Sequence, residues 1–94
     1  DVLLQDAARL HSWDQAYSDY FDHDSCNGRL PWDREPSASA ENIAWGYPTP
    51  NAAVAGWMSS TEGHCDAIMS GDYSEIGIGF SDVGGDALWT AMFR

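Results

Sequence analysis

The chain has 94 residues, and its 15 Asp and Glu against 4 Arg and no Lys give a formal net charge of −11. A surface this acidic repels a phosphate backbone, which excludes nucleic acid as a partner. Hydrophobic residues make up 44% of the chain, which excludes a disordered tail. No stretch reaches the roughly 18 apolar residues of a transmembrane segment.

The first third of the chain predicts a helix followed by loops. Apolar residues recur at helical spacing over residues 3–21, which is typical of an amphipathic helix. Turn-forming residues at 22–28 end this helix. Residues 29–40 hold two Pro and several Ser and predict a loop, with one turn at 32–35.

The middle of the chain predicts a short element and a second helix. Residues 40–45 are apolar and indicate either a brief strand or a helical turn. Thr49 and Pro50 are a typical helix start, with Thr49 as the N-cap and Pro50 at the first helical position. This helix continues to residues 59–60, and residues 67–69 indicate one further helical turn.

The last third predicts two strands joined by a turn. Apolar and small residues alternate over 75–80, a glycine-containing turn covers 82–86, and a second strand covers 87–93. The second strand is apolar on both faces, which indicates helices on both sides of the sheet. We therefore expect one α+β domain over residues 1–94, an α-β-α sandwich whose small antiparallel sheet is covered by helices.

Two cysteines predict a disulfide bridge. An even pair in a small acidic domain, without metal-ligand spacing, indicates an extracellular bridge between Cys26 and Cys65. It would close a loop of roughly 40 residues and stabilise the fold by about 4 kcal/mol in the chain-entropy model. The alternative is two unrelated buried thiols.

The predicted bridge would bring two histidines together. His23 lies three residues before Cys26 and His64 adjoins Cys65, so bonded cysteines place both imidazoles in one neighbourhood. Two imidazoles on an acidic surface indicate a divalent-cation site, with zinc or copper favoured by the ligand type. Both histidines could instead be structural, and with reduced cysteines all four residues could form a zinc site.

Glu41 is the third candidate of this neighbourhood. It stands in the apolar segment Ala-Glu-Asn-Ile-Ala, so we expect a semi-buried carboxylate that takes a nearby histidine as its partner. The alternative is a glutamate that caps a backbone turn. Ser60 lies near His64, but the sequence has no Gly-x-Ser-x-Gly elbow that would indicate a nucleophile. His11 is expected to be structural, with Asp14 or Ser12 holding a ring nitrogen.

Several of these segments together resemble a known family. The match consists of residues 8–12, 20–25, 41–46 (with Glu-Asn-Ile-Ala), 57–60, 63–69 (with Gly-His), 75–79 and 88–90. In this order and spacing the chain resembles the CAP superfamily (cysteine-rich secretory proteins, antigen 5 and pathogenesis-related 1), also called the SCP domain. The resemblance is closest to the short bacterial-type branch.

The resemblance implies secretion, an α-β-α sandwich and a central cleft with two histidines and two acidic residues, which binds a divalent cation in some members. By motif, His23 and His64 match the cleft histidines and Glu41 the first cleft glutamate. The second glutamate is replaced by Ser60, a possible cleft neighbour, so a three-residue site would hold metal more weakly. Members of the family usually carry a further helix ahead of the one that carries His11, so we expect either a shortened domain or a longer protein whose N-terminal part lies outside this sequence.

Three functions follow from the resemblance as hypotheses. The first is a secreted, non-catalytic binding or interaction module that takes a cation, a lipid or a protein ligand at the His/Glu cleft. The second is a metal-dependent, protease-like hydrolase with a metal-activated water and Glu41 as the base. The third is a structural subunit of an extracellular assembly. We expect a binding or structural role rather than an enzymatic one.

Overall fold

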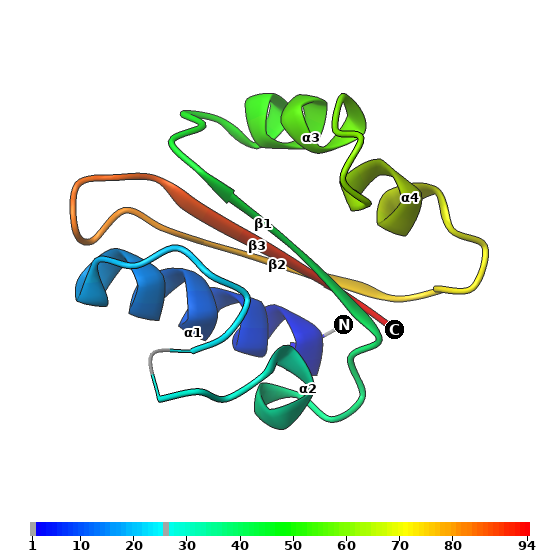
Figure 1. The fold of residues 1–94 in the computed structure, drawn as a ribbon, viewed down its shortest axis with the longest axis horizontal. Helices are drawn as coiled ribbons and strands as arrows, with labels where there is room; N and C mark the ends of the chain where they lie inside the picture. The colour runs from blue at the N-terminus through cyan, green and yellow to red at the C-terminus, as the bar shows by residue number, and fades with distance from the viewer. Residues whose placement is uncertain (1, 26) are drawn as a thin grey trace.

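The computed structural model describes residues 2–25 and 27–94, so Asp1 and Cys26 lie outside the described residues. A three-stranded sheet lies between two layers of helices (Figure 1). In chain order the elements are α1 (Val2–Ser18), α2 (Pro31–Arg34), β1 (Ala40–Trp45), α3 (Pro50–Met58), α4 (His64–Met69), β2 (Ile76–Ser81) and β3 (Leu88–Phe93). None of the described helices combines the length and the apolar run that a bilayer crossing requires.

The sheet has the strand order β1-β3-β2, and both pairs of neighbours are antiparallel. Glu41 lies opposite Met92, and Ala44 lies opposite Trp89. Helix α1 covers one face of the sheet, while α3 and α4 lie on the other (Figure 1). The predicted α+β sandwich with a small antiparallel sheet is therefore confirmed.

Helix α1 packs closely on its face of the sheet because the residues between them are small. Leu4 and Ala8 are fully buried against Met92 of β3. Gly77 and Gly79 of β2 face the helix, and a side chain at either position would overlap the α1 backbone. Close approach of the two backbones therefore depends on glycine in this strand.

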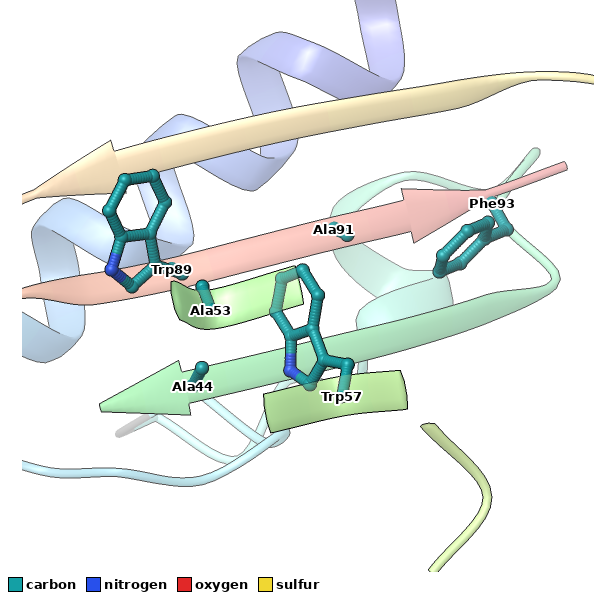
Figure 2. Packing of buried hydrophobic residues seen from close by; sticks show 6 residues of the cluster. All are labelled: Ala44, Ala53, Trp57, Trp89, Ala91 and Phe93. Atoms are coloured by element: carbon teal, nitrogen blue, oxygen red, sulfur yellow. The ribbon is translucent and has the colours of Figure 1, made fainter. Parts of the chain in front are cut away.

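The opposite face carries the larger aromatic core (Figure 2). Trp57 of α3 packs with Trp89 and Phe93 of β3, and all three are at least nine-tenths buried. Both buried indoles are satisfied, because Trp57 Nε1 donates to the Ile43 carbonyl at 2.9 Å and Trp89 Nε1 donates to the Tyr47 carbonyl at 2.8 Å. These bonds fix α3 and the loop before it over the β1 side of the sheet.

The helical cover is incomplete over β2. Helices α3 and α4 are short and pack against β1. On the same face, β2 presents Ile76, Ile78 and Phe80, each between 43% and 44% exposed. The expectation that helices cover both faces therefore holds for β1 and β3 only.

Helix α1 ends at Ser18, earlier than the predicted residue 21. Asp19 adopts the left-handed conformation with φ of 57°, and the Tyr20 amide donates to the Gln15 carbonyl at 3.2 Å. This is the Schellman arrangement, which closes a helix when one residue takes a left-handed backbone. Apolar spacing does not register that change of backbone conformation, so the predicted helix extended to Phe21.

The other boundaries agree more closely with the sequence. Thr49 caps α3, because its Oγ1 accepts from the Ala52 amide at 3.1 Å, and Pro50 begins the helix as predicted. Residues 40–45, for which both a strand and a helical turn were possible, form strand β1. Helix α4 begins at His64 instead of residue 67, because Gly63 takes the left-handed N-cap position with φ of 95°.

We predict that Gly79→Ala destabilises the fold because its new methyl group would overlap the backbone of Ala8 and Arg9. The expected loss in the free energy of unfolding is about 1–3 kcal/mol or more, as for other overpacked cores. Urea unfolding measures it, with Gly71→Ala as the control because that position faces open space. Equal stability of the two variants would contradict the close packing of α1 on β2.

Candidate functional site

One cleft of about 640 Å³ lies at the β1 edge of the sheet, between the segment that carries α2 and the segment that carries α4. It brings together all three candidate cleft residues, His23, Glu41 and His64. The rest of the lining combines carboxylates with apolar and aromatic groups: Asp24, Leu30, Pro31, Trp32, Ser39, Ala40, Asn42, Glu62, Gly63, Asp66, Ala67, Ser70 and Tyr73. The functional role of the three candidates stays a prediction.

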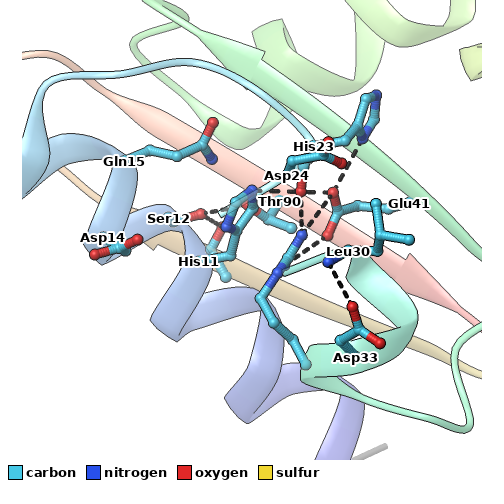
Figure 3. A network of polar contacts seen from close by, with 12 residues as sticks. His11, Ser12, Asp14, Gln15, His23, Asp24, Leu30, Asp33, Glu41 and Thr90 are labelled. Carbon is cyan, nitrogen blue, oxygen red and sulfur yellow. Dashed lines mark hydrogen bonds and ion pairs between the residues drawn. The ribbon is translucent and has the colours of Figure 1, made fainter. Parts of the chain in front are cut away.

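Glu41 is the centre of a buried ionic network (Figure 3). Its side chain is 1% exposed. Arg34 Nη1 donates to one carboxylate oxygen at 3.0 Å, and His23 Nδ1 lies 3.0 Å from the other. Arg34 Nη2 lies 3.5 Å from this second oxygen and also donates to the His23 carbonyl. Both carboxylate oxygens are therefore engaged by groups of the protein.

His11 approaches the same carboxylate from α1. Its Nε2 lies 4.0 Å from Glu41 Oε1 and donates to the Asp22 carbonyl at 2.8 Å. The expected partners Asp14 and Ser12 were wrong: the Ser12 hydroxyl lies within hydrogen-bond distance of Thr90 and of the Gly79 carbonyl, and Asp14 accepts from Tyr20. The His11 ring is buried, and it belongs to the Glu41 network. Its structural role stays a prediction.

Burial and the Glu41 carboxylate have opposite effects on the pKa of each histidine in this network, and a different one of the two dominates at His23 and at His11. The hydrogen bond to Glu41 raises the pKa of His23 above its ordinary value, against a smaller opposing effect of burial. Burial lowers the pKa of His11, and the nearby Glu41 charge only partly offsets it. At neutral pH the positive charge beside Glu41 therefore comes first from Arg34, because arginine stays protonated.

His64 lies on the other side of β1 from this network. The alternation of the strand directs Glu41 towards α1 and Asn42 towards α4, where Asn42 Nδ2 donates to the His64 carbonyl at 3.0 Å. Ser60 Oγ lies 2.8 Å from His64 Nδ1 and accepts from the Glu62 amide.

The structure describes only one of the two cysteines of the predicted disulfide. Cys65 is half-buried in α4 and has no disulfide partner among the described residues. Cys26 lies outside the described residues. The bridge and the four-ligand zinc alternative both stay predictions.

The candidate ligands His23, Glu41 and His64 do not fit a divalent cation such as zinc. Among the described residues, no three His, Cys, Asp or Glu side chains are grouped so as to hold a metal ion. Arg34 occupies the Glu41 carboxylate, and its fixed positive charge opposes a cation there. Each of the two histidines already has one ring nitrogen in a contact with a protein side chain.

Sequence reasoning missed Arg34 and Asn42 as members of the site. Glu41 was expected to pair with a histidine, and His23 does contact it, but Arg34 contacts the other carboxylate oxygen at the same distance of 3.0 Å. The signal was available, because the chain has only four cationic side chains and a buried carboxylate needs a charged partner. Which of the four would reach Glu41 depended on the path of residues 22–34.

Comparison with known proteins identifies the family. A model of the Cysteine-rich secretory protein family, CAP, matches residues 1–93. The chain belongs to the CAP family. The solved structure of an extracellular protein containing a SCP domain from Bacillus anthracis str. Ames matches this CAP domain with a TM-score of 0.84 and 28% identity, over 98% of this chain and 32% of that one.

Other relatives extend the comparison. The uncharacterized protein YkwD of Bacillus subtilis (strain 168) is 36% identical over 99% of this chain, and the uncharacterized membrane protein YlbC of the same organism is 37% identical over 84%. This chain spans 37% and 24% of their respective lengths. An outer surface protein from Borrelia burgdorferi has the same fold, with a TM-score of 0.79 at 18% identity, over 99% of this chain and 73% of that one.

We predict that His23 stabilises this CAP domain more at low pH than at high pH. A raised pKa in the folded state means that the stabilisation is complete below the ordinary value of 6.5 and is lost as the pH rises through the raised pKa. The difference in unfolding free energy between the wild type and His23→Gln should therefore shrink as the pH rises past 6.5.

Denaturant unfolding at a series of pH values measures this difference, and NMR titration of the His23 ring gives the pKa directly. His64→Gln is the control and should leave the His23 titration in place, because the His64 ring lies on the other side of β1 and contacts Ser60. A His23 ring that titrates below 6.5 would contradict the contact with Glu41.

We predict that Arg34→Met costs about 3–5 kcal/mol, because it leaves the buried Glu41 carboxylate without its fixed positive partner. Arg29→Met is the control: its guanidinium is exposed and donates to the Asp33 carbonyl, so the expected loss is about 1 kcal/mol or less. The double variant Arg34→Met with Glu41→Leu should recover most of the stability, since no buried charge remains unpaired. Chemical unfolding measures the stability of the three variants. Equal losses of unfolding free energy in Arg34→Met and Arg29→Met would contradict a stabilising role of the Arg34–Glu41 pair.

Proposed function

We propose that this CAP domain is an extracellular, non-catalytic binding module whose cleft holds a basic segment of a partner protein. The observation that supports this proposal most directly is that the Glu41 carboxylate is buried and paired within the protein. Arg34 and His23 hold it, so it shapes the cleft wall instead of presenting a reactive oxygen to a ligand.

The size and lining of the cleft support a polypeptide ligand. About 640 Å³ falls within the roughly 300–1,000 Å³ of ordinary ligand sites. Trp32 and Tyr73 supply apolar surface, while Asp24, Glu62 and Asp66 supply carboxylates. A lysine or arginine side chain matches this combination, because its apolar stem covers aromatic surface while its charged end reaches the acids.

The charge of the whole domain supports the same class of ligand. A net charge of −11 attracts basic segments over long range and speeds their association. The extracellular setting is supported by the description of the Bacillus anthracis relative as an extracellular protein.

The hydrolase hypothesis receives less support from the same geometry. Glu41 was its proposed base, and a base must present a free oxygen within hydrogen-bond reach of the proton it takes. Arg34 and His23 engage both oxygens of Glu41, and the described donor set does not suit the metal ion that this mechanism requires. A binding role needs neither a free oxygen nor a metal.

The test is selection of peptides from a random displayed library against the folded domain. We expect enrichment of sequences with Lys or Arg next to apolar residues, and NMR shifts that map selected synthetic peptides to the cleft. Asp66→Asn with Glu62→Gln should weaken these peptides about tenfold, because two exposed cleft carboxylates are neutralised.

The matched control is Asp72→Asn, an exposed carboxylate outside the cleft lining, which should leave affinity within about twofold. Selection of acidic peptides, or shifts away from the cleft, would overturn the proposal. Turnover of peptide or ester substrates that disappears in Glu41→Gln would replace it with the hydrolase.

A further inference from the structure

A second, smaller pocket of about 180 Å³ lies where α1 ends, beside the end of β1 and the turn before β3. It shares no lining residue with the cleft. Its size is below that of sites for drug-sized ligands, so it suits only a small molecule or head group. Three features of its wall together define what would fit.

The first feature is a wall of aromatic rings. Tyr20, Phe21 and Trp45 line the pocket, and the Phe21 and Trp45 ring centroids lie 6.3 Å apart. Phe21 is 46% exposed and Trp45 is 57% exposed, so both present ring surface to a ligand. Aromatic faces carry partial negative charge and attract cations, most strongly the poorly hydrated organic ammonium ions.

The second feature is negative charge without a basic partner in the lining. Asp19 and Asp86 contribute carboxylates, and no arginine is among the described residues that line the pocket. Helix α1 directs its C-terminus here, and its last turn contains no basic residue. The negative end of a 17-residue helix adds to the attraction for a cation.

The third feature is a buried amide with an unused donor. Gln15 lines the pocket and is 1% exposed. Its Oε1 accepts from the Asp22 amide at 3.0 Å, which orients the side chain. Its Nε2 has no hydrogen-bond partner among the described residues. A buried donor of this kind is satisfied by an oxygen acceptor.

We propose that this pocket binds a small organic ammonium ion that carries an oxygen acceptor, a ligand of the choline type. The ammonium lies against Phe21 and Trp45 with Asp19 and Asp86 as counter-charges. Gln15 Nε2 is buried in the free domain, so a rotation of this side chain on binding brings the donor to the ligand oxygen. A bare metal ion matches less well, because only Asp19 and Asp86 offer it ligands, and no three described His, Cys, Asp or Glu side chains are grouped to hold one. This site is independent of the cleft and of its proposed peptide ligand.

The test follows the Trp45 indole N–H by NMR while choline is added to the folded domain. We expect a saturable shift of this resonance. The neutral carbon analogue 3,3-dimethylbutan-1-ol should bind at least about tenfold more weakly, because it lacks the charge. Tetramethylammonium should also bind more weakly than choline, because it lacks the oxygen for Gln15.

Two substitutions and two matched controls complete the experiment. Trp45→Leu and Asp19→Asn should each lower choline affinity several-fold, and Asn keeps the left-handed backbone of position 19 accessible. For Trp45→Leu the binding is read from choline methyl line broadening. Trp13→Leu and Asp72→Asn, which lie outside this pocket, should leave it unchanged.

Equal binding of choline and its neutral analogue would overturn the proposal, as would an equal loss in the pocket variants and the controls. Equal binding of choline and tetramethylammonium would overturn the assigned contact with Gln15. These measurements do not depend on peptide binding in the cleft. A failure of the choline proposal is therefore distinguishable from a failure of the peptide proposal.

Discussion

The arrangement of the side chains around the cleft depends on one buried carboxylate, that of Glu41. Glu41 is held by Arg34 and by His23, with His11 of α1 at 4.0 Å. An unpaired charge at this depth would cost several kcal/mol, so the groups around it must be ordered whenever the domain is folded. His23 and Arg34 both contact Glu41, which holds these two residues beside β1. His23 and Glu41 line the cleft, so this network shapes part of its wall.

The position of α1 depends on a different constraint, which is the absence of side chains on one face of β2. Gly77 and Gly79 allow the helix backbone to approach the strand, and this brings His11 within reach of the Glu41 network. The same alternation places Ile76, Ile78 and Phe80 on the opposite face, where no described helix covers them. The two faces of β2 therefore differ because one row is glycine and the other is large and apolar.

The acidity of the chain has different consequences in different places. At Glu41 the charge is neutralised by the protein itself, while Asp24, Glu62 and Asp66 line the mouth of the cleft. At the end of α1, Asp19 and Asp86 stand beside aromatic rings without a basic residue in the described lining. The chain has few arginines to neutralise these carboxylates, so both the cleft and the smaller pocket favour cationic ligands.

The sequence by itself determined the class of the fold and most of its elements, and its three candidate residues His23, Glu41 and His64 line one cleft. Period-two alternation, the Thr49 cap and the glycine turns are local signals that indicate the main strands and helices. They left Glu41 between a strand and a helical turn and placed His64 ahead of the last helical turn, whereas the structure has Glu41 in β1 and His64 at the start of α4. Only the tertiary structure decided that Arg34 holds Glu41, that Asp19 ends α1, and that Gln15, in the pocket with Phe21 and Trp45, has an amide N–H without a partner among the described residues. Side-chain partners far apart in the chain depend on how loops cross the sheet, and hydrophobic spacing carries no information about that path.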